Sequence, residues 1–260
     1  MSLQAVFALG RSAALLATLA LVDALADAPD PLLLEGEPGT GKTVLARFIH
    51  QRSGVQGDFI VRPIPAIPDS LQQSVLFGHA RGAFTGATGD QRGLIESAQG
   101  GTLFLDELGE ATPSVQASLL EVLESGTVTR LGEARSRPVS VRILAATNAD
   151  LTERSRSGGF RRDLLDRFGP FRIPIPPLRE RKDEIVQLFL GFLAEAASGA
   201  EGAIEVAWAV DAAVQTLLLS HPWPGNLRQL RKEARFAARL CRGQRIVRYE
   251  HLSPDLQADG

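Results

Sequence analysis

The run Leu32-Leu33-Leu34-Glu35-Gly36-Glu37-Pro38-Gly39-Thr40-Gly41-Lys42-Thr43 decides the fold of this chain. Residues 31–35 predict a short buried strand, and the apolar spacing of residues 44–52 predicts a helix. The loop between them has the spacing G-x-x-x-x-G-K-T, in which glycines let backbone N–H groups curl around phosphates. Lys42 is then expected to reach the terminal phosphates of a nucleotide, and Thr43 to hold magnesium. The residues expected around that nucleotide are Gly36, Glu37, Pro38, Gly39, Thr40, Gly41, Lys42, Thr43 and Val44.

Lysine usage supports this interpretation of the loop. Arginine is the usual cation of the chain, because Lys42, Lys182 and Lys232 are the only lysines among 28 basic residues. A compact ammonium suits a point contact with phosphate, whereas a guanidinium is a planar fork. The use of lysine and not arginine at residue 42 therefore supports a phosphate-binding role for this loop.

Two further strands are expected to carry polar groups to one edge of a sheet. Residues 101–107 predict an apolar strand that delivers Asp106 and Glu107 at its carboxyl end, where open α/β sheets bind ligands. Asp106 would support magnesium, and Glu107 would polarise an attacking water. Residues 139–146 predict another buried strand, which ends in Thr147-Asn148, whose side chains can sense a terminal phosphate.

The order of strands and helices predicts the fold class. Residues 59–62 predict a strand that runs into Pro63, Pro65 and Pro68, which are expected to prevent regular pairing there. Because strands alternate with helices, we expect a mostly parallel α/β sheet covered on both faces. After Arg179 helices are predicted at residues 184–197, 211–220 and 227–240, with Asn226 as an N-cap. The expected domains are therefore residues 1–177, which are α/β, and residues 178–260, which are helical.

Composition limits the classes of partner. The chain has 260 residues and a net charge of -2, and no polybasic tract alternates with aromatic residues, so no autonomous nucleic-acid groove is expected. The single cysteine, Cys241, cannot form an internal disulfide and suits a reducing cytoplasm. The four histidines lie too far apart in sequence for a local metal motif.

The N-terminal segment has two interpretations. Residues 12–22 are apolar, follow Arg11 and precede Ala26-Asp27-Ala28, so they imitate a signal peptide with a small-residue cleavage site. The competing interpretation is a helix, because a nucleotide site begins soon afterwards and the run is too short to span a bilayer. We favour the helix and expect a cytoplasmic protein with no membrane partner. Its apolar positions at helical spacing are Leu15, Leu16, Leu19 and Val22.

A glycine-rich run, Gly82-Ala83-Phe84-Thr85-Gly86-Ala87-Thr88-Gly89, separates the helical patterns of residues 69–77 and 93–98. Phe84 stands among glycines without a large apolar neighbour. One interpretation is a flexible surface loop whose Phe84 folds back onto the body of the protein. The other is a displayed contact loop inserted in a helix.

Over residues 30–255 the motifs resemble, in one continuous order, the AAA+ ATPase domain of bacterial enhancer-binding proteins, which activate sigma-54 RNA polymerase. Gly82-Ala83-Phe84-Thr85-Gly86-Ala87 is identical to the GAFTGA signature of that family. In the family this loop touches sigma-54, and ATP turnover moves it so that the closed promoter complex can open. The resemblance implies that these six residues bind the partner and that ATP and Mg²⁺ are the ligands.

The resemblance implies a set of catalytic and metal-binding residues in the first domain. Asp106 and Glu107 match the family's Walker B pair, with Thr43 and Asp106 toward the metal, and Thr147 and Asn148 match its first sensor. Lys42 completes this set.

Three arginines carry over as well. Arg161 and Arg167 match the arginine fingers that reach the ATP of a neighbouring subunit, and Arg228 matches the second sensor on the helical lid. An arginine supplied in trans completes the site only between subunits, so the resemblance implies a homo-oligomeric ring, hexameric as in the family.

The chain departs from the family pattern at four points. The asparagine that restrains the catalytic glutamate falls at Pro63, which has no side-chain amide. Two acidic residues near the base of the loop are replaced by Val75 and Ala80. Because the given sequence stops soon after the lid, we expect neither a helix-turn-helix nor an N-terminal receiver domain within these 260 residues.

The leading hypothesis is an ATP-hydrolysing, ring-forming remodeller of sigma-54 RNA polymerase that activates transcription. Pro63 motivates an alternative, a nucleotide-binding regulatory or scaffold protein of the same fold with weak or absent hydrolysis. A third hypothesis is an AAA+ machine that acts on a different protein.

Overall fold

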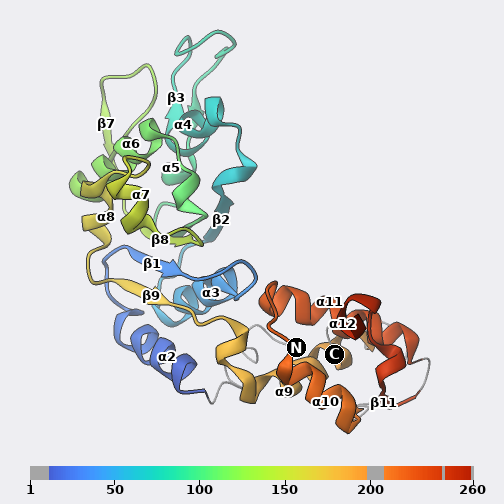
Figure 1. Cartoon of the computed structure of the whole chain (residues 1–260). Helices are drawn as coiled ribbons and strands as arrows, with labels where there is room; N and C mark the ends of the chain where they lie inside the picture. Colours follow the sequence, from blue (N-terminus) through green and yellow to red (C-terminus); the bar gives the residue numbers. More distant parts are fainter. Residues whose placement is uncertain (1–11, 198–207, 242–243, 259–260) are drawn as a thin grey trace. The chain divides into compact units, whose positions relative to one another are not determined.

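The computed structural model describes residues 12–197, 208–241 and 244–258 (Figure 1). Its contacts divide into two compact units. The sheet unit comprises Leu21–Gly36 and Lys42–Pro174. The lid unit comprises the described residues before Leu21, the loop segment Glu37–Gly41, and the described residues from Ile175 onward.

The sheet unit is built on five parallel strands. In the order β2-β5-β8-β1-β9 they are β2 (Phe59–Pro63), β5 (Thr102–Asp106), β8 (Arg142–Thr147), β1 (Leu32–Glu35) and β9 (Arg172–Pro174). Every pairing is parallel, with Leu34 opposite Ala146 and Leu105 opposite Ala145. Central strands of this kind are buried on both faces and read as continuous apolar runs, as β1 and β8 do. The predicted α/β fold is confirmed.

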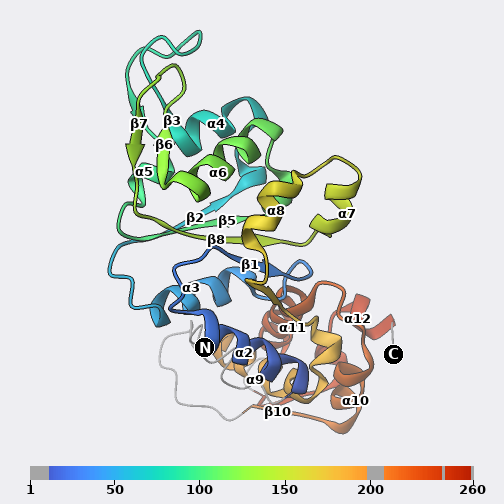
Figure 2. The same cartoon turned by 90° about the vertical axis from the view of Figure 1, so that its left-hand side faces the viewer.

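Helices cover both faces of this sheet (Figure 2). Alternate residues of a strand point to opposite faces of the sheet. Leu33 and Leu103 point to the same face, where they pack in one buried cluster with Phe168. That face carries α6 (Pro113–Ser125), α7 (Leu151–Arg156) and α8 (Arg162–Phe168). The opposite face carries α3 (Lys42–Arg52), where the His50 ring bonds Thr102 Oγ1 at 2.9 Å.

The glycine-rich loop leaves the sheet unit between two helices, α4 (Asp69–Phe77) and α5 (Leu94–Ser97). Two short strands, β3 (Gly78–His79) and β4 (Gln91–Arg92), pair at its base, which the sequence did not predict. A second hairpin, β6 (Thr127–Thr129) with β7 (Ser136–Pro138), lies beside it, and Ala80 N–H donates to Leu131 O at 2.9 Å. Two 3₁₀ turns, Ile64–Ala66 and Leu108–Glu110, complete the unit.

The lid unit is mainly helical. Its elements are the 3₁₀ turns Leu178–Glu180 and Tyr249–His251, the helices α9 (Lys182–Ala197), α10 (Ala212–Ser220), α11 (Asn226–Leu240) and α12 (Pro254–Ala258), and a strand pair of β10 (Ala209–Val210) with β11 (Ile246–Val247). Its core holds a fully buried ion pair, Arg181 with Glu184 at 2.6 Å, and Ser12 Oγ donates to the same carboxylate at 3.0 Å.

The N-terminal run forms the predicted helix, α2 (Ala13–Leu25). Leu15 and Val22 are fully buried, whereas Leu16 is 51% exposed, so the predicted apolar face is wrong at that position. Within the sheet unit, the Arg142 guanidinium donates to Leu25 O at 3.1 Å and to Ala26 O. Among the described residues, no helix has both the length and the apolarity needed to cross a membrane.

Two strand predictions need correction. Pro63 does not end the pairing of β2, because it lies in register with Asp106 of β5. The reason is that β2 is an edge strand, where a proline that lacks an N–H is tolerated. The strand predicted from Val139 begins instead at Arg142, since the preceding residues close the β6–β7 hairpin.

Asn226 is not the N-cap of α11. Gly225 occupies that position without a side-chain bond, and Asn226 is the first helical residue, with a φ of 50°. Its side chain is bonded elsewhere in the lid unit, as described below.

Candidate functional site

Lys42 lies where residues 36–43, which we call the phosphate loop, enter α3. In the sheet unit its Nζ donates to Gly36 O at 2.9 Å and lies 3.2 Å from Glu107 Oε1. The side chain is only 7% exposed. Gly36 N–H donates to Thr147 O at 3.1 Å, so the end of β1 is fixed to the end of β8. The residues predicted from separate strands therefore meet at one edge of the sheet.

Asp106 and Thr43, the two residues expected to hold a metal, lie close to each other. Thr43 Oγ1 lies 3.5 Å from Asp106 Oδ2. Burial, and then the neighbouring Glu107 carboxylate, raise the pKa of Asp106, and the opposing effect of Lys42 is smaller. One hydroxyl and one carboxylate fit Mg²⁺, which is usually held by one or two carboxylates together with phosphate oxygens. No group of three or more His, Cys, Asp or Glu side chains in the described part of the chain could hold a metal without such help.

Glu107 is held in a particular conformation by its neighbours. Its φ of 57° is left-handed, which is uncommon for a residue other than glycine. One carboxylate oxygen pairs with Lys42, and the other accepts the Asn148 N–H at 3.0 Å. Pro63 offers this carboxylate no donor. Lys42 and Asn148 therefore restrain Glu107 here, a feature that the sequence pattern did not indicate.

The remaining loop residues, Glu37–Gly41, belong to the lid unit. Gly39 has a φ of 81°, and its carbonyl accepts the Leu227 N–H at 3.0 Å. Thr40 Oγ1 donates to Glu37 O at 2.8 Å. Arg228 is exposed one residue further along α11, and its Cβ would lie 3.1 Å from a Cβ built on Gly39. The predicted second sensor thus lies beside the phosphate loop.

Sequence reasoning missed two polar residues of this loop contact, Arg179 and Asn226. Arg179 donates to both oxygens of Glu37, and Asn226 bonds Glu37 and Pro38. The sequence carried a signal in Trp-Pro-Gly-Asn, but a local capping role was the simpler interpretation of it.

The glycine-rich loop closes on itself in the sheet unit. Gly82 N–H donates to Ala87 O at 2.8 Å, and Ala87 N–H donates to Phe84 O at 3.0 Å. Phe84 is 39% exposed, and its ring meets His79 edge-on, with the centroids 5.0 Å apart. Phe84 is thus partly displayed and partly folded back, so both interpretations describe part of its environment.

Arg161 and Arg167 lie at the two ends of α8 and are exposed. Arg161 pairs with Asp163 at 2.7 Å, and Arg167 pairs with Glu124 at 3.5 Å. The structure therefore does not bring them to Lys42, Asp106 or Glu107 within the single chain.

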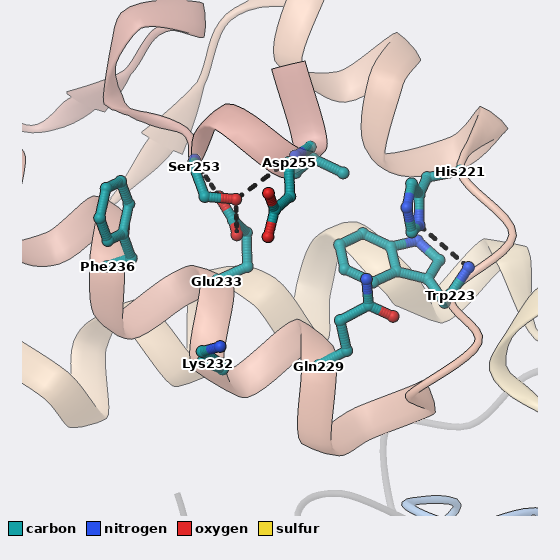
Figure 3. Close-up of a pocket in the computed structure, with 9 residues that line it drawn as sticks. His221, Trp223, Gln229, Lys232, Glu233, Phe236, Ser253 and Asp255 are labelled. Carbon is teal, nitrogen blue, oxygen red and sulfur yellow. Dashed lines mark hydrogen bonds between the residues drawn. The ribbon is translucent and has the colours of Figure 1, made fainter. Parts of the chain in front are cut away.

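A separate cavity of about 170 Å³ lies within the lid unit (Figure 3). Trp223, Lys232 and Phe236 contribute to its wall, and Glu233 accepts bonds from Ser253 N–H and Oγ. The volume is below that of typical ligand sites, about 300 Å³ or more. It is lined by α11, α12 and the turn before α11, and not by the phosphate loop.

Two family models together match nearly the whole chain. The family model described as the Sigma-54 interaction domain matches residues 8–174, and the model described as the AAA+ ATPase lid domain matches residues 179–260. The nitric oxide reductase transcription regulator NorR1 of Cupriavidus necator is 45% identical over 234 residues, which are 90% of this chain and 45% of that protein. The C4-dicarboxylate transport transcriptional regulatory protein DctD of Rhizobium meliloti is 42% identical over 220 residues, 84% of this chain and 46% of the relative.

Solved structures agree with this match. NtrX from Brucella abortus, in crystal structures with ADP and with ATP, superposes with a TM-score of 0.86 at 28% identity, over 96% of this chain and 55% of that one. The chain spans about half the length of these proteins.

Proposed function

Because the chain belongs to the sigma-54 interaction domain family of AAA+ ATPases, we propose that it hydrolyses ATP within a ring of like subunits and remodels sigma-54 RNA polymerase through residues 82–87. The observation that carries the proposal is the meeting of Lys42, Thr43, Asp106 and Glu107 at the carboxyl edge of the parallel sheet. Activation of transcription in the cytoplasm is the role that follows.

The proposed chemistry assigns one task to each group. Lys42 binds the terminal phosphates, and Glu107 orients and deprotonates the attacking water. Magnesium, held by Thr43 and Asp106, would neutralise phosphate charge as the bond breaks. Asn148, beside Glu107, would register the terminal phosphate, and Thr147 fixes the end of β8.

Arg161 and Arg167 are proposed to act on the ATP of a neighbouring subunit. Their exposure on α8, and their pairing with Asp163 and Glu124, support a role in trans. An arginine finger is worth about 10³ to 10⁵ in rate. A ring, six subunits in the family pattern, would place each α8 against the next phosphate loop.

The arginine assignment is tested with neighbouring residues of one helix. Arg161→Ala should lower kcat by about 10³ or more and leave ATP binding intact. Arg162→Ala is the matched control, because Arg162 is also exposed on α8 and, among the described residues, pairs with Asp166 at 3.8 Å. Mixing Arg161→Ala with Lys42→Ala subunits should restore part of the turnover, since each supplies the group that the other lacks. Equal losses in the two α8 variants, or no recovery on mixing, would refute the trans role.

The role of the loop is tested by binding. Phe84→Ala should abolish ATP-dependent binding to sigma-54, measured with a transition-state mimic, while ATP turnover continues. Leu71→Ala is the control, because Leu71 is 43% exposed, close to the 39% of Phe84, and lies outside the loop. If the wild-type protein hydrolyses ATP but does not bind sigma-54, the machine acts on a different protein.

One observation favours a second function, a nucleotide-binding scaffold with little hydrolysis. Pro63 lies opposite Asp106 without a side-chain donor, and Glu107 is occupied by Lys42. A ring enzyme should gain specific ATPase activity as protein concentration rises and subunits assemble. A scaffold should bind ATP stoichiometrically at every concentration without turnover.

A further inference from the structure

Asn226 connects the lid helix to the phosphate loop. It is fully buried, and its Oδ1 accepts the Leu178 N–H at 2.7 Å. Its Nδ2 donates to Glu37 Oε2 at 3.0 Å and to Pro38 O at 3.1 Å. The amide thus uses its acceptor and both donors, and two of its three bonds hold the phosphate loop. A left-handed φ of 50° is the backbone conformation that allows this, and asparagine tolerates it better than most residues.

Glu37 is the opposite half of the contact. Arg179 donates to its two oxygens at 2.9 and 2.6 Å, in the bidentate arrangement that gives strong, directional pairing. These bonds, followed by the bond from Asn226, lower the pKa of Glu37 to about 2. The carboxylate is therefore ionised at every pH at which the protein would work, and the contact does not switch with pH.

A backbone hydrogen bond extends the contact between the phosphate loop and α11 to the next residue of each. Leu227 N–H donates to Gly39 O at 3.0 Å, directly after the bond from Asn226 to Pro38. Gly39 can approach this closely because it has no side chain: an added Cβ would lie 2.4 Å from Gly225 O. Three successive loop residues, 37–39, are thereby tied to the first turn of α11, which carries Arg228.

We propose that Asn226, with Glu37 and Arg179, is a positioning residue for ATP binding. It fixes the position of loop residues 37–39 relative to Arg228. The loop and the second sensor are thereby held in the arrangement that binds the phosphates before ATP arrives. This inference rests on the proposed function, because it needs ATP as the ligand. Preorganisation lowers the entropy lost on binding, so its removal should appear chiefly in nucleotide affinity.

The test compares ATP affinity, KM and kcat of variants in the full chain. Asn226→Asp keeps the shape but removes both donors and sets a second negative charge against Glu37. It should weaken ATP binding by about tenfold to a hundredfold, the size expected for a lost hydrogen bond to a charged group, and raise KM more than it lowers kcat. Asn226→Ala should act in the same direction. Gln229→Ala is the control, because Gln229 lies in the same turn but its side chain accepts the Gly225 N–H, at 2.9 Å, and makes no hydrogen bond to residues 37–39 in the described part of the chain.

Two further variants separate positioning from simple loss of folding. Arg179→Ala alters an exposed side chain and should weaken ATP binding several-fold without unfolding the lid. The double variant Glu37→Gln with Asn226→Asp restores an amide opposite a carboxylate and should recover part of the affinity. Melting temperatures are measured for each.

The outcomes are distinguishable. If the wild-type protein does not bind ATP, the proposed function fails. If it binds ATP and the folded Asn226 and Arg179 variants bind within twofold of wild type and of Gln229→Ala, the positioning role is overturned while the function stands.

Discussion

Replacing Gly39 by Ala should disrupt the contact between the phosphate loop and α11. The new Cβ would lie 2.4 Å from Gly225 O and 3.1 Å from Arg228 Cβ, and the φ of 81° is left-handed. The backbone conformation alone costs a residue with a Cβ about 1–2 kcal/mol. Overpacking against a backbone carbonyl adds about 1–3 kcal/mol, so a total of about 2–5 kcal/mol is expected.

The control is Gly54→Ala. Gly54 has a φ of 73°, but an added Cβ meets nothing within 4 Å, so only the backbone cost of about 1–2 kcal/mol remains. Both tryptophans of the chain, Trp208 and Trp223, lie in the lid unit, so their fluorescence reports its unfolding in urea. Gly39→Ala should shift the fluorescence transition to lower urea and weaken ATP binding. Gly54→Ala should leave both unchanged and should shift only the unfolding of the sheet unit, which circular dichroism of the whole chain reports. Equal shifts of the fluorescence transition in the two variants would show that the close approach of Gly39 to α11 does not contribute to stability.

Three further changes probe the sheet unit. Arg130→Met should cost about 1.5–3 kcal/mol in the free energy of unfolding, because the buried Glu96 loses its bonds from Arg130 at 2.6 and 2.8 Å and keeps Arg92 at 3.6 Å. Arg130 lowers the pKa of Glu96, so this stabilisation is present above the ordinary pKa of 4.5 and should fade in urea titrations as pH falls below it. Asp106→Asn should raise the urea midpoint at neutral pH while abolishing turnover: the pKa of Asp106 is raised by burial, so its ionised form costs stability as pH rises above 3.8. Glu107→Gln should lower kcat by about 10² to 10⁴ and tighten ATP binding in a filter or fluorescence assay, because Lys42 loses a competing partner.

The sequence predicted those parts of the site that are set by local pattern. A strand followed by glycines and Lys42 needs no distant residue to be interpreted, and an apolar run that ends in Asp106 must end at the same edge in a parallel sheet. The local sequence could not predict that Pro63 lies in an edge strand. Whether a proline interrupts pairing depends on which strand has a free side, and that is decided by strand order.

Asn226 illustrates a second limit. Before a helical run, asparagine most often caps its own helix, and that local rule gave the wrong role here. Its actual partners are Glu37 and Leu178, 189 and 48 residues away in the chain. No periodicity encodes a bond between an amide and a loop of such separation, so it became visible only once α11 and the loop were placed in one unit.

The position of Glu107 suggests how this chain can dispense with an amide at residue 63. A catalytic carboxylate needs a partner that holds it before nucleotide arrives and releases it afterwards. Lys42 meets both requirements, because it pairs with Glu107 at 3.2 Å and is also the group expected to bind the terminal phosphates. Phosphate oxygens and the carboxylate would then compete for one ammonium, so that ATP binding would itself free Glu107 toward water. The bond from Asn148 N–H would keep the freed carboxylate near the end of β8, where the terminal phosphate is sensed. In such an arrangement the restraint and the trigger are one residue, and no side-chain amide is needed at Pro63.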